Sequence, residues 1–372
     1  MRQAYATSNA AITKGTCSHE LGRRASDTLH NAREQVRLFI GAASHEEIVF
    51  FPSTFDAMRT LASSYCQLLK REEEVILGDL GDRHSQLWKT ASRNGLFRVV
   101  HATDMSLAAM AHLISSKTRL FVLRSASAFG NVHDLGDTLE FLQALEIPVI
   151  LEVSDTLQYG HLQAEKRGVD FLVSDCTGIG APAAFLYGKM HRLERLPPAF
   201  GGEQSLLQCT CTDESGLDIA NWGPIPERFD VGMPCLPTIA SIGTVVERYN
   251  AIISRPMTRT LFENQAKYLH EQLRLSDGLC VYGDAENRAP FACFNVSGAD
   301  SVIVVEKLKE HGILVRVGCH DSRQVHENND VSASLRADVS FENHTNDDID
   351  LFVESLRAVV GKHSAINPLQ FA

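Results

Sequence analysis

Acidic and reactive side chains follow two apolar runs near the middle of the chain. The run Val149–Leu151 leads into Glu152 and Asp155, and the run Val169–Val173 leads towards Cys176. Short apolar runs that end in small and polar residues are typical of buried parallel strands, which deliver side chains to a site at their carboxyl ends. Two carboxylates there could perform acid–base chemistry on a small acid, provided that burial separates their pKa values.

Basic side chains elsewhere could complete such a site. Arg83 and His84 lie in the segment GDLGDRHSQLWKTA, and Arg336 lies in the segment SLRA. Arginine can stack on a flat ring or bind a carboxylate through two parallel hydrogen bonds. The alternative is that these are surface or capping residues, with Arg336 paired to Asp338 or Asp347. The carboxylates and His84 could bind a hard metal ion, but the signal is weak, and we expect no metal site.

Length, charge and cysteine content limit the classes of protein. A chain of 372 residues usually forms two domains. Its formal net charge of −11 argues against nucleic acid and anionic membranes as partners. No apolar run reaches the length of a membrane span, and the first residues lack the apolar core of a secretory signal. The nine cysteines have no zinc-like spacing, so we expect reduced thiols and a cytoplasmic location.

Apolar strand patterns alternate with helical patterns along the first two thirds of the chain. This alternation predicts a large, doubly wound and mostly parallel sheet, with ligands at the carboxyl ends of its strands. We expect a large α/β domain at 1–235, connecting helices at 236–276 and a small α+β domain at 277–372. In the small domain, strands are predicted at Leu279–Tyr282, Phe291–Val296 and Leu314–Val317, with helices at Asp300–His311 and Asp347–Val359.

Four segments together resemble one known family. They are LYGK at Leu186–Lys189, PPAFGGE at 197–203, ERFDVGMP at 227–234 and HTNDDIDLFV at 344–353. The chain resembles the class V aminotransferase and cysteine desulfurase family from about Asn9 to Leu356. The family uses pyridoxal phosphate (PLP), and the resemblance implies fold type I and a homodimer. Relatives have Gly-Thr-Pro where this chain has Met233 between Gly232 and Pro234.

The resemblance also implies where a cofactor would lie. Glu152 aligns with the carboxylate that meets the PLP ring nitrogen, and Asp155 aligns with a residue near the phenolic oxygen. The Schiff-base lysine aligns with Thr177 or Gly178, neither of which can form an imine. Residues of the former cofactor site would be Ser53, Thr54, Ser127, Ser174 and Thr177. An alternative for Ser53 or Thr54 is to cap the helix that begins near Asp56.

Substrate contacts and the mobile loop follow from the same resemblance. Arg83 takes the position of a histidine that stacks on the ring, with His84 beside it. Arg336 aligns with the residue that binds the substrate carboxylate. Asp321 replaces the persulfide cysteine, and Cys319 lies two residues earlier. The substrate-binding candidates are therefore Arg336, Arg83 and Arg316, and the catalytic candidates are Glu152, Asp155, His84, Cys176 and Asp321.

Three functions are compatible with these departures from the family. Our first hypothesis is a repurposed enzyme that acts by acid–base chemistry on a small amino acid or carboxylate. A non-catalytic partner or sensor is the second, and a residual lyase or transferase with noncovalently held PLP is the third. We expect no covalently bound cofactor, and classical aminotransferase or desulfurase activity is not expected because the lysine is missing.

Overall fold

The computed structural model describes residues 19–95, 97–160, 162–200, 205–211, 218–230, 232, 235–284 and 286–366. The expectations for Asn9, Met233 and Pro234 fall outside these residues. The chain divides into two compact units. Unit 1 holds the described residues of Met1–Gly78, His84–Arg124 and Leu135–Ser254, and unit 2 holds those of Asp79–Arg83, Ser125–Asp134 and Arg255–Ala372. In the described part, every helix is too short or too polar to cross a membrane.

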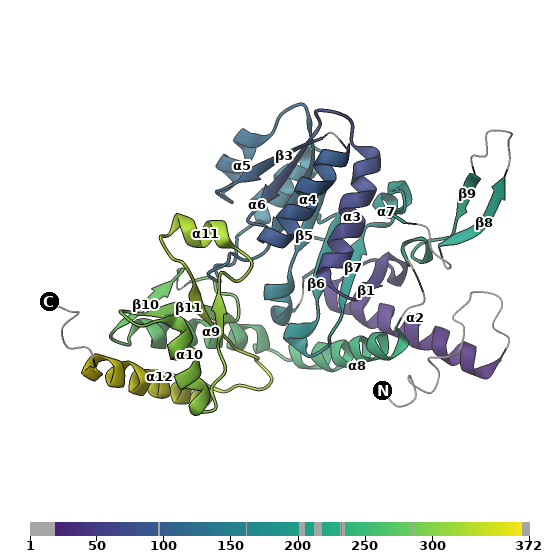
Figure 1. Ribbon diagram of the computed structural model, residues 1–372. Coiled ribbons are helices and arrows are strands. Elements are labelled where there is room, and N and C mark those ends of the chain that lie inside the picture. The colour runs from purple at the N-terminus through teal and green to yellow at the C-terminus, as the bar shows by residue number, and fades with distance from the viewer. Residues whose placement is uncertain are drawn as a thin grey trace. The chain divides into compact units, whose positions relative to one another are not determined.

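Unit 1 is built around a seven-stranded sheet (Figure 1). The strand order is β1-β7-β6-β5-β4-β2-β3, and β2 to β6 run parallel while β7 is antiparallel to both β6 and β1. The run IVFF is buried except for the partly buried Phe50, and the run VILE is buried throughout, as expected for strands covered on both faces. The strands are β1 (Ile48–Phe51), β2 (Glu74–Gly78), β3 (Arg98–Ala102), β4 (Thr118–Arg124), β5 (Val149–Glu152), β6 (Phe171–Asp175) and β7 (Ala184–Gly188).

Helices connect and cover these strands (Figure 1). Several begin at a residue whose side chain caps the helix: Ser53 accepts a hydrogen bond from the Asp56 amide, and Ser106 accepts one from Ala109. Because each cap stands just after a strand or turn, these residues determine where the chain changes direction. The connecting helices are α3 (Thr54–Leu68), α4 (Asp82–Gly95), α5 (Leu107–Leu113), α6 (Gly136–Ala144) and α7 (Met190–Arg195), with short turns η1 (His45–Glu47), η2 (Ser154–Tyr159), η3 (Thr177–Ile179) and η4 (Glu227–Phe229).

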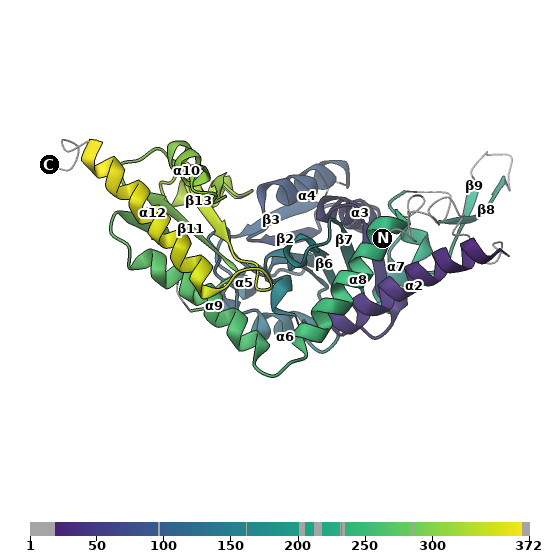
Figure 2. The same cartoon turned by 90° about the horizontal axis from the view of Figure 1, so that it is seen from below.

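Two long helices pack against each other beside this sheet, α2 (Glu20–Ile40) and α8 (Leu236–Ile253) (Figure 2). Their interface includes Leu29 and Ile239 in a cluster of buried apolar side chains. The helices approach closely at Gly243, where an added Cβ would lie 3.1 Å from the Cα of Ala32. A larger residue at this position would therefore require the neighbouring backbone to shift by a few tenths of an ångström. A separate hairpin is formed by β8 (Leu206–Cys211) and β9 (Asp218–Trp222).

Unit 2 contains a four-stranded antiparallel sheet in the order β10-β11-β13-β12. One face of this sheet contacts helices, as shown by the packing of Phe294 against Phe352 with ring centroids 6.1 Å apart. The other face carries Ser334 and Arg336, because successive side chains of a strand alternate between faces. The elements are α9 (Thr258–Arg274), β10 (Leu279–Tyr282), β11 (Phe291–Val296), α10 (Ser301–Glu310), β12 (Arg316–Gly318), α11 (Arg323–Asn328), β13 (Ser334–Asp338) and α12 (Asn346–Ile366).

The predicted fold class is confirmed, including the large mostly parallel sheet and the smaller unit with antiparallel strands. Three details differ from the sequence expectations. The strand expected at Leu314–Val317 begins two residues later, and β13 and the β8–β9 hairpin were not expected at all. The proposed boundaries at 235 and 276 remain a prediction; unit 2 also includes Asp79–Arg83 and Ser125–Asp134 from the first half of the chain.

Candidate active site

Three charged side chains meet at the carboxyl ends of β4 and β5 in unit 1. Arg124 and Glu152 are register neighbours on these parallel strands, and Arg124 Nε lies 3.5 Å from Glu152 Oε2. The Nη2 group of Arg124 also pairs with the carboxylate of Asp155, just beyond the end of β5. The Ser154 amide donates to Glu152 Oε1 at 2.9 Å. We name Arg124, Glu152 and Asp155 the edge cluster.

Burial determines the electrostatics of the edge cluster. Only 5% of Glu152 is exposed. Burial raises the pKa of this carboxyl, and the nearby Asp155 raises it further, although the Arg124 guanidinium acts in the opposite direction. One buried guanidinium thus faces two carboxylates. Glu152 is consequently the group best placed to hold or release a proton at this edge.

The loop after β6 forms a second hydrogen-bonded group beside η2. The Asp175 amide donates to Ser154 Oγ at 3.0 Å, and Asp175 Oδ1 accepts from both the amide and the hydroxyl of Thr177. Ser174 is fully buried, and its hydroxyl donates to the Asp175 carbonyl at 2.8 Å. The two predicted cofactor contacts, Ser174 and Thr177, therefore use their hydroxyls within the protein.

Cys176 is close to the edge cluster in sequence, but its environment does not favour a reactive thiol. The residue is fully buried, and burial raises the pKa of its thiol far above the usual range, with Asp175 adding to the shift. A cysteine reacts as the thiolate, which this environment disfavours. The structure thus gives no support to a catalytic Cys176, because its side chain is buried in the core.

The start of α3 serves the helix itself. Ser53 caps the helix, which confirms the alternative stated for this residue, and its hydroxyl donates to Asp56 Oδ2 at 2.8 Å. Asp56 also pairs with Arg59 at 3.0 Å. Thr54 is the first residue of the helix. Nearby, the His84 ring stacks on Phe55 with centroids 6.3 Å apart. An anion at this helix start would meet the Asp56 carboxylate.

Unit 2 holds the remaining predicted site residues near its loops. Arg83 is 3.5 Å from Asp321 through Nε and Oδ1, and its amide donates to the same carboxylate oxygen at 3.2 Å. The Arg83 side chain is 80% exposed. Ser127 forms a turn with Asn131, whose amide donates to Ser127 Oγ at 3.1 Å. The structure thus brings Arg83 and Asp321 together, a contact that the resemblance did not predict.

Arg316 and Arg336 stand opposite each other on β12 and β13. Both pair with Asp338, so the alternative that Arg336 binds Asp338 is confirmed. Arg336 is nevertheless buried, and its guanidinium lies 3.4 Å from the ring centroid of Phe291. It is therefore a packed side chain and not a surface one.

Sequence reasoning missed a buried Ser–His group beside these arginines. Ser334 and His326 are both fully buried. Because His326 Nδ1 faces the Ser322 carbonyl at 2.9 Å, that nitrogen carries the proton, and its Nε2 accepts from Ser334 Oγ at 2.9 Å. His320 Nε2 then donates to the carbonyl and hydroxyl oxygens of Ser334. This network fixes the loop that carries Cys319 and Asp321.

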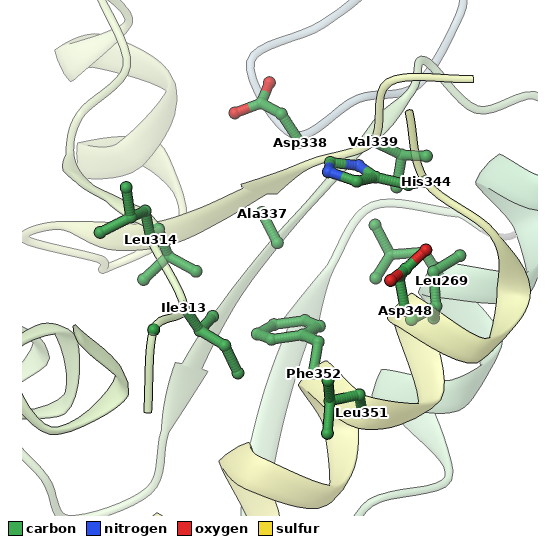
Figure 3. A pocket seen from close by; sticks show the side chains of 13 residues that line it. Leu269, Ile313, Leu314, Ala337, Asp338, Val339, His344, Asp348, Leu351 and Phe352 are labelled. Atoms are coloured by element: carbon green, nitrogen blue, oxygen red, sulfur yellow. The ribbon is translucent and has the colours of Figure 1, made fainter. Parts of the chain in front are cut away.

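A pocket of about 480 Å³ opens on the other face of the small sheet (Figure 3). Ile313, Leu314, Ala337 and Phe352 form its apolar lining, and Figure 3 shows the Asp338 carboxylate directed away from them. The pocket therefore belongs to the helix-covered side of β13. Across the described residues, no group of three or more His, Cys, Asp or Glu side chains could hold a metal ion.

Comparisons with known proteins converge on one family. The family model described as aminotransferase class-V matches residues 1–352. A probable cysteine desulfurase of Synechocystis sp. is 27% identical over 96% of this chain and 86% of its own length. A probable cysteine desulfurase of Halalkalibacterium halodurans is 26% identical over 95% of this chain and 86% of its own length.

Solved structures share the fold. The cysteine desulfurase CsdA of Escherichia coli superposes with a TM-score of 0.83 at 18% identity, over 97% of this chain and 90% of its own. A mutant of C-DES, in which lysine is replaced by alanine, has glycine covalently linked to its PLP cofactor. It superposes with a TM-score of 0.75 at 14% identity, over 96% of this chain and 92% of its own.

These findings correct two expectations from the sequence. The two curated relatives and the fold neighbour from Escherichia coli are named cysteine desulfurases, which contradicts the repurposed enzyme, the non-catalytic partner or sensor and the residual enzyme with noncovalently held PLP. The expectation of no covalently bound cofactor is contradicted in the same way, since this fold holds a covalently linked PLP in one of its neighbours. Both expectations gave the alignment of Thr177 or Gly178 with the lysine more weight than the resemblance of the whole chain supports.

Proposed function

The chain belongs to the class-V aminotransferase family, and from this premise we propose that it is a PLP-dependent enzyme of the cysteine desulfurase type. Cysteine or a closely similar sulfur-containing amino acid would be its substrate. The relatives named above support this proposal through their names and their coverage of the chain. The structural observation that carries it is the buried carboxylate of Glu152 at the carboxyl end of β5.

The Glu152 carboxyl group is suited to pair with the ring nitrogen of the cofactor. A buried carboxyl with a raised pKa gains a charged partner when a protonated ring nitrogen approaches, which favours its ionised form. Arg124 and the Ser154 amide hold the carboxyl in place meanwhile. The start of α3 fits the phosphate less well, because Asp56 brings a negative charge to it.

The lysines of this region do not fit a covalent anchor at the edge cluster. Lys189 follows β7, whose last residue Gly188 pairs with Phe171 at the start of β6. Lys189 therefore lies at the amino end of β6, whereas Glu152 lies at the carboxyl end of β5. Lys166 is exposed in the segment before β6. Because a solved structure with this fold holds a covalently linked PLP, we propose that the cofactor is bound covalently in this chain as well.

When bound, PLP supplies an aldehyde that bonds to an amino group and a ring that accepts electrons from the substrate. The residues of this chain would perform the remaining tasks. Glu152 orients the ring and balances its charge, Arg124 keeps Glu152 and Asp155 from repelling each other, and Asp155 is the second carboxylate available for proton transfer. Arg336, with its planar guanidinium, would bind the carboxylate of the amino acid.

Turnover of L-cysteine tests the proposal. We expect the purified chain with added PLP and dithiothreitol to release alanine from cysteine, as measured by mass spectrometry. Dithiothreitol is the thiol that accepts the sulfur atom, and its second thiol then releases the sulfur as sulfide while dithiothreitol is oxidised to its disulfide. Glu152→Gln should lose at least about 90% of this activity because it removes the charge that faces the ring nitrogen. The matched control is Glu165→Gln, which removes an exposed carboxylate elsewhere in unit 1. Wild-type protein that releases no more alanine than PLP alone would refute the proposal.

We also propose a homodimer and a cytoplasmic location. The homodimer rests on the family resemblance, and sedimentation of the purified chain would test it. The location rests on the free thiols of the described cysteines, which include the buried Cys176 and Cys293 and the exposed Cys235 and Cys280.

A further inference from the structure

One carboxylate in unit 2 is bound by two arginines at once. Asp338 Oδ2 accepts from Arg316 Nε at 3.0 Å and from Nη2 at 2.6 Å. Asp338 Oδ1 accepts from Arg336 Nε at 2.9 Å and lies 2.8 Å from Nη2. Each guanidinium thus presents both of its adjacent N–H groups to a single carboxylate oxygen. We call Arg316 and Arg336 the arginine pair.

The two arginines differ in how firmly they are held. The Arg336 side chain is 9% exposed and stacks on Phe291, so its donors point in a fixed direction. The Arg316 side chain is 63% exposed, and Asp338 is 38% exposed. Water therefore reaches Asp338 and Arg316 but hardly reaches Arg336. A carboxylate from solution could approach on the exposed side, where the bound carboxylate can also leave.

We propose that Asp338 competes with the substrate carboxylate for the arginine pair and thereby sets the affinity of the protein for amino acids. The proposal rests on the proposed function for the identity of the ligand as an amino acid. Geometry supports the competition, because Asp338 already occupies the donors of Arg336 that a carboxylate would need. Charge supports it as well, since two guanidinium groups keep a net positive charge after binding one carboxylate.

The cost of exchange is modest. Ion pairs with an exposed partner contribute little to stability, because water replaces the lost contacts. Asp338 can therefore leave Arg336 and stay with Arg316, or turn to solvent, when a second carboxylate arrives. Among the other groups on this face, His320 stays neutral because burial and the arginine pair lower its pKa to about 4. The neighbouring Cys293 is uncharged as well, since burial raises the pKa of its thiol.

Binding of L-alanine by calorimetry tests the competition without any turnover. We expect Asp338→Asn to bind L-alanine about tenfold more tightly than the wild type, because the side chain keeps its size but loses its charge. Asp338→Ser should behave in the same way, and Asp338→Glu should restore weak binding. Glu354→Gln, which removes an exposed carboxylate from α12, should leave the affinity within about twofold of the wild type.

Two further measurements make the result specific. Ethylamine, which lacks a carboxylate, should bind Asp338→Asn and the wild type equally. Adding Arg336→Ala to Asp338→Asn should abolish the gain in affinity for L-alanine, because the N–H donors of Arg336 are then removed. Equal or weaker binding of L-alanine by a folded Asp338→Asn protein would overturn the proposal. Absence of cysteine turnover with tighter binding by Asp338→Asn would instead refute only the proposed function.

Discussion

The edge cluster and the arginine pair with Asp338 are opposite arrangements of the same chemical groups. In the edge cluster, one guanidinium lies between two carboxylates, and all three side chains are at most 12% exposed. On the small sheet, two guanidinium groups hold one carboxylate, and two of the three side chains are more than a third exposed. The first has more carboxyl groups than guanidinium groups, and the second has more guanidinium groups than carboxyl groups.

The comparison teaches that burial and charge surplus together decide which groups stay ionised. In the edge cluster, burial raises the pKa of Glu152 and so favours its neutral form. Beside the arginine pair, burial and positive charge lower the pKa of His320 and also favour its neutral form. Exposure then separates the two regions, because only the exposed carboxylate Asp338 can exchange with a ligand at small cost.

The largest expected effect comes from Arg124→Ala. This substitution leaves Glu152 and Asp155 close together without a cation, so we expect the free energy of unfolding to fall by about 3–5 kcal/mol. Urea denaturation at pH 7 would measure the loss. Arg98→Ala is the control, because Arg98 is 59% exposed and lies 3.9 Å from Glu74. Equal losses in the two variants would show that the edge cluster is not a coupled buried group.

A smaller effect concerns the pH dependence of stability through Glu152. Its pKa is raised in the folded state, so the folded protein binds the proton more tightly than the unfolded chain does. This contribution is full below the unfolded value of about 4.5 and is lost as the pH rises through the folded pKa. Glu152→Gln should therefore be least stable relative to the wild type at low pH and gain on it as the pH rises. A stability difference that stays constant from pH 4 to 8 would argue against a shifted carboxyl.

Arg316→Ala should cost at most about 1 kcal/mol, because its partner Asp338 keeps Arg336 and remains partly solvated. The same urea experiment measures it beside Arg124→Ala. A loss as large as that of Arg124→Ala would remove the distinction between the two regions.

The last prediction needs no substitution and is spectroscopic. We expect the His320 ring to titrate near pH 4 in a proton NMR experiment, since burial, Arg336, His326 and Arg316 all disfavour its charged form. The folded pKa lies below the unfolded value of about 6.5, so His320 favours folding above that pH and opposes it as the pH falls towards 4. A titration midpoint near 6.5 would show that Arg336 and Arg316 do not lower the pKa of the His320 ring.

Much of the fold follows from the sequence because its apolar runs and helix caps act locally. The run Val149–Leu151 becomes β5, and Ser53 caps α3 as one alternative foresaw. Strand β13 was missed because Ser334 and Arg336 interrupt its apolar pattern, although both are buried through polar partners.

The site was harder to predict because its contacts join distant parts of the chain. Glu152 and Asp155 were identified from their place after a strand, but their cation Arg124 lies on another strand and gives no local signal. Cys176 shows the converse, since a residue close to the site in sequence can be fully buried in the core. Arg336 was identified as a candidate, and its partner Asp338 was named as an alternative. The second ion pair of Asp338, with Arg316, depends on the strand register and could not be predicted locally.

Absorbance spectroscopy with PLP and glycine tests the central claim, that a covalently linked cofactor depends on Glu152. Glycine avoids the ring closure that a thiol would add. We expect wild-type protein and Glu165→Gln to produce the same new visible band, distinct from that of PLP with glycine alone, and Glu152→Ala to lose it. A wild-type spectrum identical to that of the protein-free mixture would contradict the claim.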